Sequence, residues 1–261
     1  MVVGVSAGAW SWRGGGRAVR LWADADLRYP LEAAERTRSP GLLQRFEQET
    51  GIRVNVEYGD PHEWMASSAF QPGDLVLTAD GRLVARLEHG VGLQSNTPVA
   101  RHVPVVLVNT RNQHEIKATK DLLNPRLHLG IVSTQQKLLG RFTIAQLSAV
   151  DVPAAQVRAQ RRFQGEDGDT IAGATQAQRV EAAIVWRDTA LRYPARTRFL
   201  EWPDQHVVGP VVRALIPAGA RRSGEAQQLA GFLVGPQAED VFRHYGFDTR
   251  DLETWSVSAS P

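Results

Sequence analysis

The sequence predicts an α/β protein built mainly from parallel β-sheets. Short apolar runs of the kind found in buried strands, such as HVPVVLVN at 102–109 and AAIVW at 182–186, alternate along the chain with segments of helical spacing. The chain has 261 residues, of which 43% are hydrophobic and 22% charged, as in ordinary globular proteins. This length suffices for one large domain or two smaller ones, each with its own core.

The first β-α-β unit can be followed residue by residue. An extended run at 19–23 breaks at 24–26, and a helix follows, with Pro30 in its first turn and an interruption at 39–41. Gly51 ends that helix, and the alternation of apolar and polar residues at 52–56 indicates the next strand. Two parallel strands joined by a right-handed crossover are therefore expected.

The remaining elements repeat this alternation. A second unit runs through 64–70 into a buried strand, and we expect strands at 74–78, 103–109, 128–132, 182–186 and 211–216 and helices at 120–123, 140–149, 225–233 and 237–245. In open sheets of this kind, ligands bind beyond the carboxyl ends of the strands. The junctions that matter are therefore 24–26, 59–63, 78–80, 133–137 and 186–188.

Composition excludes several classes of function. The formal net charge is only +2, which argues against a nucleic-acid-binding surface. The absence of cysteine excludes disulfides, thiolate metal sites and thiol catalysis. No apolar run approaches the ~20 residues that cross a bilayer. The small-residue triplet at 7–9 resembles a signal cleavage site without a full apolar region before it, so residues 1–16 are interpreted as a truncated signal remnant or a disordered lead.

Several segments, in order, resemble one known family. They are VRLWADADLRYPLEAA (19–34) with LLQRFEQETGIRVNVEYGD (42–60), PGDLVLTAD (72–80), HVPVVLVNTRN (102–112) with IKATKDLLNPRLHLGIV (116–132), AAIVWRDTAL (182–191), and VVRALIPAGARRSGEAQQLAGFLVGPQAEDVFRHYGF (211–247). Together they look like the type II periplasmic solute-binding proteins of ABC transporters, and most like the molybdate-binding group. The last segment is the most specific, because two helices flank a Gly-Pro break and the second ends in Tyr-Gly-Phe.

The resemblance implies a two-lobed fold that closes on its ligand about a hinge of two crossovers. One lobe is expected at 17–100 with 209–261 and the other at 101–208. It implies an extracytoplasmic or periplasmic, monomeric solute-binding protein that delivers a small molecule or oxyanion to an ABC permease in the membrane. No cofactor, nucleic acid or catalysis is expected, since no nucleophile elbow, phosphate-binding loop or metalloprotease motif is present. The alternative is a stand-alone ligand-sensing domain of a regulatory system.

The expected ligand contacts follow from matching the chain to the family's loops. They are Asp24, Asp26, Gly59, Asp60, Thr78, Ala79, Asp80, Gln135, Thr170, Trp186 and Arg187. The chain departs from the molybdate-binding pattern, in which neutral donors hold the oxyanion. Asp26 stands where the family has a serine, Gly59-Asp60-Pro61 replaces Gly-Ser, and Trp186 takes the place of a tyrosine.

These acidic replacements leave the ligand open. Two like charges 4 Å apart repel by about 4 kcal/mol at an effective dielectric constant of ~20, which weakens binding roughly a thousandfold. The carboxylates therefore favour a cationic or hydrogen-bond-donating ligand over plain molybdate or sulfate, although some related tungstate binders do use carboxylates. Asp24, Asp26, Asp60, His62 and Glu63 also include the residue types that ligate a divalent metal. The plainer alternative is that Asp24 or Asp26 caps the following helix and that Asp60 and Glu63 occupy a favourable first turn.

The second-lobe candidates have plain alternatives too. Thr170 is expected as an N-cap that presents N–H groups to the ligand or only caps its helix. Trp186 and Trp64 either stack on an organic ligand or pack in the core. Arg187 and Asp188 form either part of the site or a local surface pair.

Overall fold

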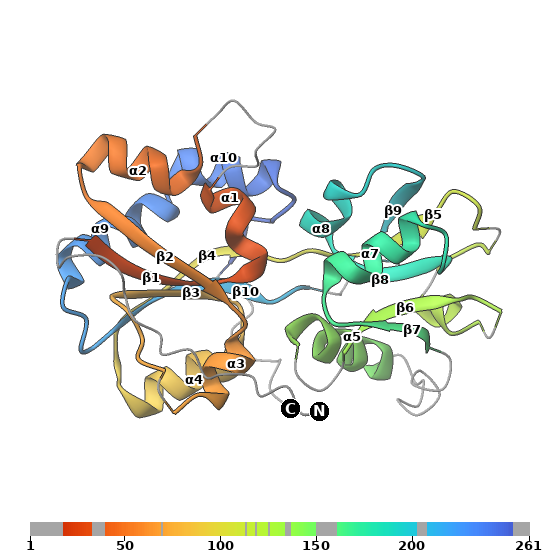
Figure 1. The fold of residues 1–261 in the computed structure, drawn as a ribbon, viewed down its shortest axis with the longest axis horizontal. Helices are drawn as coiled ribbons and strands as arrows, with labels where there is room; N and C mark the ends of the chain where they lie inside the picture. Colours follow the sequence, from red (N-terminus) through yellow and green to blue (C-terminus); the bar gives the residue numbers. More distant parts are fainter. Residues whose placement is uncertain are drawn as a thin grey trace, which may run out of the picture. The chain divides into compact units, whose positions relative to one another are not determined.

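The computed structural model describes residues 18–32, 40–68, 70–112, 114–117, 119–124, 126–133, 137–149, 161–202 and 208–252. The chain divides into two compact units (Figure 1): Met1–Thr97 with Ala214–Phe232, and Pro98–Arg213 with Leu233–Pro261. The predicted lead at 1–16 lies outside the described residues. Within the described ranges, no helix combines the length and the apolar character that a membrane span needs.

The first unit is built on a five-stranded sheet of order β2-β1-β3-β10-β4. β4 and β10 run through the two points at which the division into units falls. The elements are β1 (Ala18–Asp24), η1 (Ala25–Leu27), α1 (Arg28–Glu32), α2 (Leu42–Thr50), β2 (Arg53–Gly59), α3 (Pro61–Ala66), β3 (Leu75–Thr78), α4 (Gly81–Gly90), β4 (Leu93–Arg101), β10 (Val211–Pro217) and α9 (Ser223–Leu233).

The predicted β-α-β unit is present. β1 lies between β2 and β3 and is parallel to both, with Val19 opposite Val54 and Trp22 opposite Val76. α2 ends where Gly51 adopts the left-handed conformation (φ 71°), which glycine enters without steric cost. The sequence therefore predicted both the crossover and its stop signal correctly.

Helices cover both faces of this sheet. Trp22 and Val76 of the sheet pack with Trp64 of α3 and Leu83 and Leu87 of α4 in one apolar cluster. α2 contacts α9 through Phe46 and Phe232, whose rings lie 5.5 Å apart. The central strand β3 is thus buried along its whole length, which explains its continuous apolar sequence, whereas β2 and most of β4 are less buried and carry polar residues.

One buried carboxylate joins three elements of the first unit. Asp74, directly before β3, is 1% exposed. Its Oδ2 accepts a hydrogen bond from the backbone N–H of Arg20 in β1 (2.9 Å), and its Oδ1 accepts from the N–H groups of Arg221 and Arg222 before α9 (3.0 and 3.2 Å). The carboxylate thereby satisfies backbone donors that side chains or water must otherwise satisfy.

The second unit has a five-stranded sheet of order β7-β6-β8-β5-β9. Strands β7, β6 and β8 are parallel, whereas β5 runs antiparallel to both β8 and β9. The sheet is therefore mixed, because β5 follows β4 after two residues and enters without a crossover helix. The elements are β5 (Pro104–Asn109), η2 (Thr119–Leu123), β6 (Leu129–Val132), α5 (Leu138–Ala149), β7 (Arg161–Gly165), α7 (Gly168–Gln176), β8 (Ala182–Trp186), α8 (Arg187–Arg192), β9 (Thr197–Glu201) and α10 (Pro236–His244).

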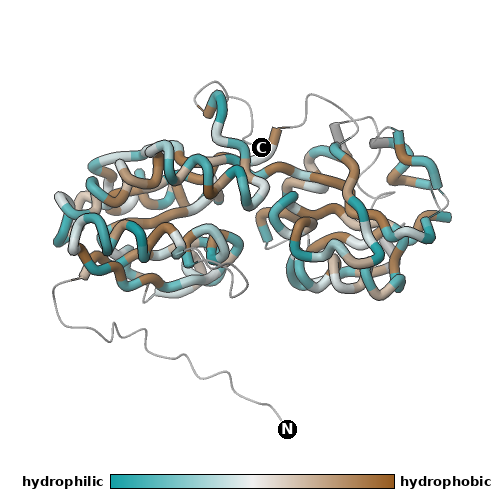
Figure 2. Tube along the Cα trace, turned by 90° about the horizontal axis from the view of Figure 1, so that it is seen from above, coloured by the Kyte–Doolittle hydropathy of each residue, from teal (hydrophilic) through white to brown (hydrophobic). Residues whose placement is uncertain are grey.

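The core of the second unit surrounds β5, β6 and β8. Every described residue of these three strands is buried. α5 packs on β6 and β8, while α7 contacts β5, β6, β7 and β8. Figure 2 shows the consequence within each unit: hydrophobic stretches run through the middle, and hydrophilic positions follow the outer turns.

Two connecting segments lie side by side in the second unit. The N–H of His102 donates to the carbonyl oxygen of Pro210 (3.1 Å), and Arg101 and Asp248 exchange two backbone hydrogen bonds (2.7 and 3.0 Å). A Cβ atom on Gly209 would lie 1.9 Å from the carbonyl oxygen of His102, so only glycine allows this approach. The segments that precede β5 and β10 are therefore held together by backbone contacts.

Candidate functional site

The predicted first-lobe residues meet at one edge of the first sheet. Asp24, Gly59 and Thr78 are the last residues of β1, β2 and β3. Asp24 lies opposite Gly59 in the parallel register, and Ala23 lies opposite Leu77. The carboxyl ends of the three strands therefore share this edge, which we call the strand-end group: Asp24, Asp26, Gly59, Asp60, Thr78, Ala79 and Asp80.

Asp24 is the buried centre of this group. Asp24 is 7% exposed. Its Oδ2 accepts hydrogen bonds from the Thr78 hydroxyl (3.0 Å) and the Ala79 N–H (2.8 Å). Its Oδ1 is buried and has no hydrogen-bond partner among the described residues. Burial raises the pKa of Asp24 well above its ordinary value; the two hydrogen bonds oppose the rise, and the nearby Asp26 and Asp80 add to it.

Helix capping does not explain Asp24. The residue occupies the N-cap position of η1, but its side chain makes no capping hydrogen bond. It instead ties the end of β1 to the turn after β3. Asp26 lies inside η1, in its first turn, and is half-buried, so it does not occupy the N-cap position that the plainer alternative gave to Asp24 or Asp26.

Asp60 and Asp80, by contrast, are N-caps. Asp60 accepts from the N–H of His62 (2.7 Å) at the start of α3, where Glu63 also lies in the first turn. Asp80 accepts from the N–H of Arg82 (2.9 Å) at the start of α4 and forms an ion pair with the Arg82 side chain (3.5 Å). Glu63 lies in the first turn as the plainer alternative expects, whereas the sequence had assigned a capping role to neither Asp60 nor Asp80.

Trp64 packs in the core. It lies edge-on to Trp22 at 5.1 Å and stacks on Phe70 at 5.8 Å. Its indole nitrogen is buried and has no hydrogen-bond partner in the part of the chain that the structure describes. A Cβ atom on Gly59 would lie 2.5 Å from that nitrogen, so glycine at the end of β2 makes room for the indole.

The structure corrects two predictions in the second unit. The N-cap of α7 is Asp167, not Thr170, and the Thr170 N–H is used by the Asp167 carboxylate (2.7 Å). Arg187 does not pair with its neighbour Asp188; it forms an ion pair with Glu201 across to β9. Gln135 lies outside the described residues.

Trp186 is a core residue at the end of β8. It is 1% exposed and stacks on His102 with ring centroids 4.9 Å apart. Phe142 of α5 packs against it at 5.2 Å. These contacts match the core-packing alternative for Trp186.

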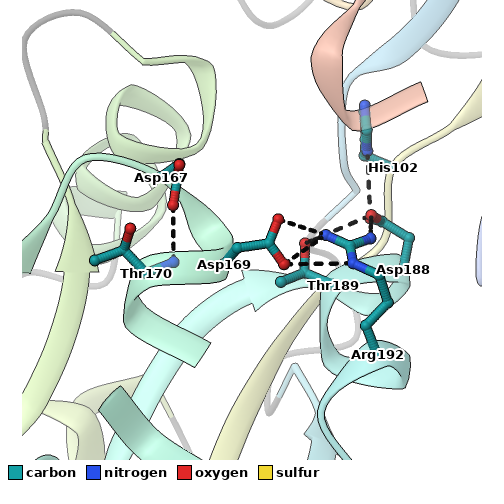
Figure 3. Close-up of polar contacts among 7 residues, drawn as sticks. All are labelled: His102, Asp167, Asp169, Thr170, Asp188, Thr189 and Arg192. Carbon is teal, nitrogen blue, oxygen red and sulfur yellow. Dashed lines mark hydrogen bonds and ion pairs between the residues drawn. The ribbon is translucent and has the colours of Figure 1, made fainter. Parts of the chain in front are cut away.

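Figure 3 shows a charged network that sequence reasoning missed. Arg192 reaches both oxygens of Asp169 (3.0 Å each) and Oδ2 of Asp188 (2.9 Å). Burial raises the pKa of Asp188 to about 6, although Arg192 opposes the rise. Burial alone lowers the pKa of Arg192, but Asp188 and Asp169 outweigh it and hold the pKa above its ordinary value, so the guanidinium stays charged.

His102 borders this network without joining it electrostatically. Its Nδ1 lies 3.9 Å from Oδ1 of Asp188, which is too far for a hydrogen bond. Burial lowers the pKa of His102 to about 3, so the ring is neutral at ordinary pH. The i,i+4 spacing of Asp188 and Arg192 was a readable signal in the sequence; the contacts to Asp169 and His102 depend on tertiary structure alone.

The metal alternative gains no geometric support. Across the described ranges, no group of three or more His, Cys, Asp or Glu side chains is placed to hold a metal ion. The strand-end carboxylates bind backbone N–H groups or a hydroxyl instead.

Comparison with known proteins identifies the class of protein. Residues 40–248 match the family described as "Bacterial extracellular solute-binding protein". The chain therefore belongs to this family, a class of non-enzymatic solute-binding proteins, as the sequence predicted. A curated relative from Haemophilus influenzae, described as "Putative binding protein", is 27% identical over 237 residues, which are 87% of this chain and 89% of the relative.

Solved structures confirm the type II periplasmic binding protein fold. The "substrate binding domain of putative molybdenum ABC transporter from Clostridium difficile" has a TM-score of 0.70 at 13% identity and matches 88% of this chain and 98% of its own. The periplasmic molybdate-binding protein of Azotobacter vinelandii has a TM-score of 0.68 at 16% identity, with the same coverage of both chains. At these identities the likeness establishes the fold alone.

Proposed function

We propose that this protein is the extracytoplasmic solute-binding component of an ABC importer, that it acts as a monomer, and that the strand-end group contacts its solute. Membership of the solute-binding family supports binding of a small solute. The two similar solved structures, one a substrate-binding domain of a putative molybdenum ABC transporter and one a periplasmic molybdate-binding protein, support delivery to a membrane permease.

The main support for this location of the site is the burial of Asp24 and the carboxylate oxygen that it leaves unpartnered among the described residues. A carboxylate at the end of a strand, 7% exposed and with one oxygen unpartnered among the described residues, carries a cost of desolvation that packing does not offset. It lies where ligands bind in open α/β sheets, beyond the carboxyl ends of parallel strands. Asp26, Gly59 and Thr78 are proposed to contact the solute together with it.

The second-unit candidates have weaker support. Trp186 is packed in the core, and the Thr170 N–H already has an acceptor. Arg187 remains a proposed contact, because it is half-buried and its Nε has no hydrogen-bond partner within the described residues.

Substitution of Asp26 tests the proposed site. We expect Asp26→Ala to change the affinity for the solute at least tenfold and to leave the melting temperature of the free protein nearly unchanged, since the side chain is half-buried and caps no helix. Solute identity comes from a thermal-shift screen of oxyanions, divalent metals and organic cations, because binding raises the melting temperature by mass action. Glu49→Ala, an exposed acidic position at the end of α2, is the matched control. A fall in melting temperature with unchanged affinity would mean that Asp26 is only structural.

The importer role can be tested without knowing the solute. The gene neighbourhood is inspected first: an adjacent permease and ATPase support the importer, whereas an isolated gene beside regulators supports sensing. An adjacent permease and ATPase are then reconstituted in liposomes, and the protein is added with whatever solute it carries after purification. Stimulated ATP hydrolysis supports the importer. A protein that binds solute but leaves ATP hydrolysis unchanged would instead fit the sensing domain of a regulatory system.

A further inference from the structure

We infer that residues 245–251, which we call the clasp, hold the chain that enters β5 and thereby limit how far the two units move when solute binds. Phe247 and Arg101 are then positioning residues for solute binding, although neither belongs to the strand-end group. The inference rests on the proposed function, because such a restraint matters in a protein whose units close on a solute.

Three consecutive residues at the end of β4 and after it are tied to three different segments. Arg101 exchanges two backbone hydrogen bonds with Asp248 of the clasp (2.7 and 3.0 Å). The N–H of His102 donates to the carbonyl oxygen of Pro210, and the carbonyl oxygen of Val103 accepts from the first N–H of α8 (2.7 Å). A change of backbone direction at these residues must therefore break or strain hydrogen bonds.

This part of the chain links the two sheets. β4 pairs within the first sheet and β5 within the second, and only residues 102 and 103 separate the two strands. Hinges absorb their motion in a few residues at the ends of elements. A restraint on residues 101–103 therefore acts on the motion between the units.

Phe247 packs on this link from the side of the clasp. It is 3% exposed, and its ring centroid lies 5.0 Å from that of His102 and 5.6 Å from that of Phe242 in α10. His102 in turn stacks on Trp186 at the end of β8. The imidazole, in a residue that is 2% exposed, is thus enclosed between the clasp and the core of the second unit.

The side chain of Arg101 adds a second tie to the clasp. The residue is 7% exposed, and its Nη2 donates to the carbonyl oxygen of Asp251 at 3.1 Å. Burial lowers the pKa of Arg101, and the carboxylates of Asp248 and Asp251 oppose the shift. The clasp therefore supplies both a hydrogen-bond acceptor and negative charge to this arginine.

Gly246 brings the clasp against the start of α8. Its φ of 90° lies in the left-handed region that favours glycine. A Cβ atom at this position would lie 3.1 Å from the backbone nitrogen of Asp188 and 3.0 Å from Cδ1 of Leu191. The clasp thus follows the backbone of α8 closely and joins that helix to the link between β4 and β5.

Spin labels on the two units measure their motion directly. The chain has no cysteine of its own, so Glu49→Cys in the first unit and Arg198→Cys in the second provide two exposed labelling sites. Double electron–electron resonance on the full chain, with no solute added, gives the distribution of distances between the labels.

Two clasp variants and two matched controls are compared on this labelled background. Phe247→Ala removes the ring that packs on the link, and Arg101→Met removes the side-chain hydrogen bond to the clasp but keeps the apolar stem. The controls are Phe232→Ala, which removes a half-buried ring of α9, and Arg243→Met, which removes an exposed arginine of α10.

We expect each clasp variant to widen the distance distribution by roughly twofold or more, while both controls keep the wild-type width. An unchanged width in a folded clasp variant overturns the inference. Equal widening in either control also overturns it, because a general loss of stability would then explain the effect. Should Phe247→Ala fail to fold, Arg101→Met decides by the same criteria. No solute enters the measurement, so the ATPase assay decides separately on the importer.

Discussion

Removal of the Asp74 carboxylate should destabilise the first unit more than any exposed acidic substitution does. The carboxylate accepts from three backbone N–H groups, those of Arg20, Arg221 and Arg222, and from Nε of Arg20 at 3.4 Å. It thereby joins β1, β3 and the start of α9 at a position that is 1% exposed. Asp74→Ala leaves all of these donors without their acceptor.

The magnitude follows from the number of donors. Each buried donor left unsatisfied costs about 1–3 kcal/mol, and water can replace part of the loss because Arg20 and Arg222 are half-buried and Arg221 is exposed. We therefore expect Asp74→Ala to lower the free energy of unfolding by about 3–4 kcal/mol. For a chain of this size that corresponds to a fall in melting temperature of roughly 10 °C. Asp74→Asn keeps one acceptor oxygen and should lose about half as much.

Urea unfolding followed by tryptophan fluorescence measures this change, since Trp22 and Trp64 lie in the same unit as Asp74. Hydrogen exchange should show the lost protection in β1, β3 and the start of α9. Asp240→Ala, whose carboxylate is 77% exposed, is the control and should stay within about 0.5 kcal/mol of wild type. Stability of Asp74→Ala within about 1 kcal/mol of wild type would refute the bridging role.

Two further predictions concern the second unit. The pKa of Asp188 is about 6 in the folded chain against an ordinary 3.8, so its contribution to stability is full below about pH 4 and is lost as the pH rises through 6. Between pH 4 and pH 7, the free energy of unfolding of wild type should therefore fall by on the order of 2–3 kcal/mol relative to that of Asp188→Asn. Urea unfolding measures both, and a difference that does not change with pH would contradict this prediction. Gly209→Ala should lower the melting temperature by several degrees, because its Cβ would lie 1.9 Å from the His102 carbonyl oxygen, whereas Gly219→Ala, with open space around it, should not. Equal effects of the two glycine substitutions would argue against a close backbone approach.

The sequence determined those elements whose signal is local. β5 and β8 were predicted within a residue or two, because a continuous apolar run must be buried on both faces. The end of α2 at Gly51 and the start of α10 at Pro236 were also predictable from single residues. Glycine readily adopts the left-handed conformation that ends a helix, and proline is favoured in the first turn of a helix. The order of these segments was enough to indicate the family, which the comparison then confirmed.

Elements with weaker local signals were missed. β4 carries polar residues at Gln94 and Asn96 and a proline at 98, so it forms a strand through pairing within the sheet and not through its own preference. α4 was overlooked although Leu83 and Leu87 have the i,i+4 spacing of a buried helix face. The antiparallel entry of β5 could not be predicted, since strand direction depends on the path of the connecting chain.

The candidate site divides in the same way. The sequence by itself placed carboxylates at the ends of β1, β2 and β3, because parallel strands bring their carboxyl ends to one edge. Only the tertiary structure decided that Asp60 and Asp80 cap helices and that Asp24 is buried with one oxygen left unpartnered in the described chain. The physical reason is that burial and hydrogen-bond partners depend on which distant segments pack together, and a local pattern of residues does not contain that information.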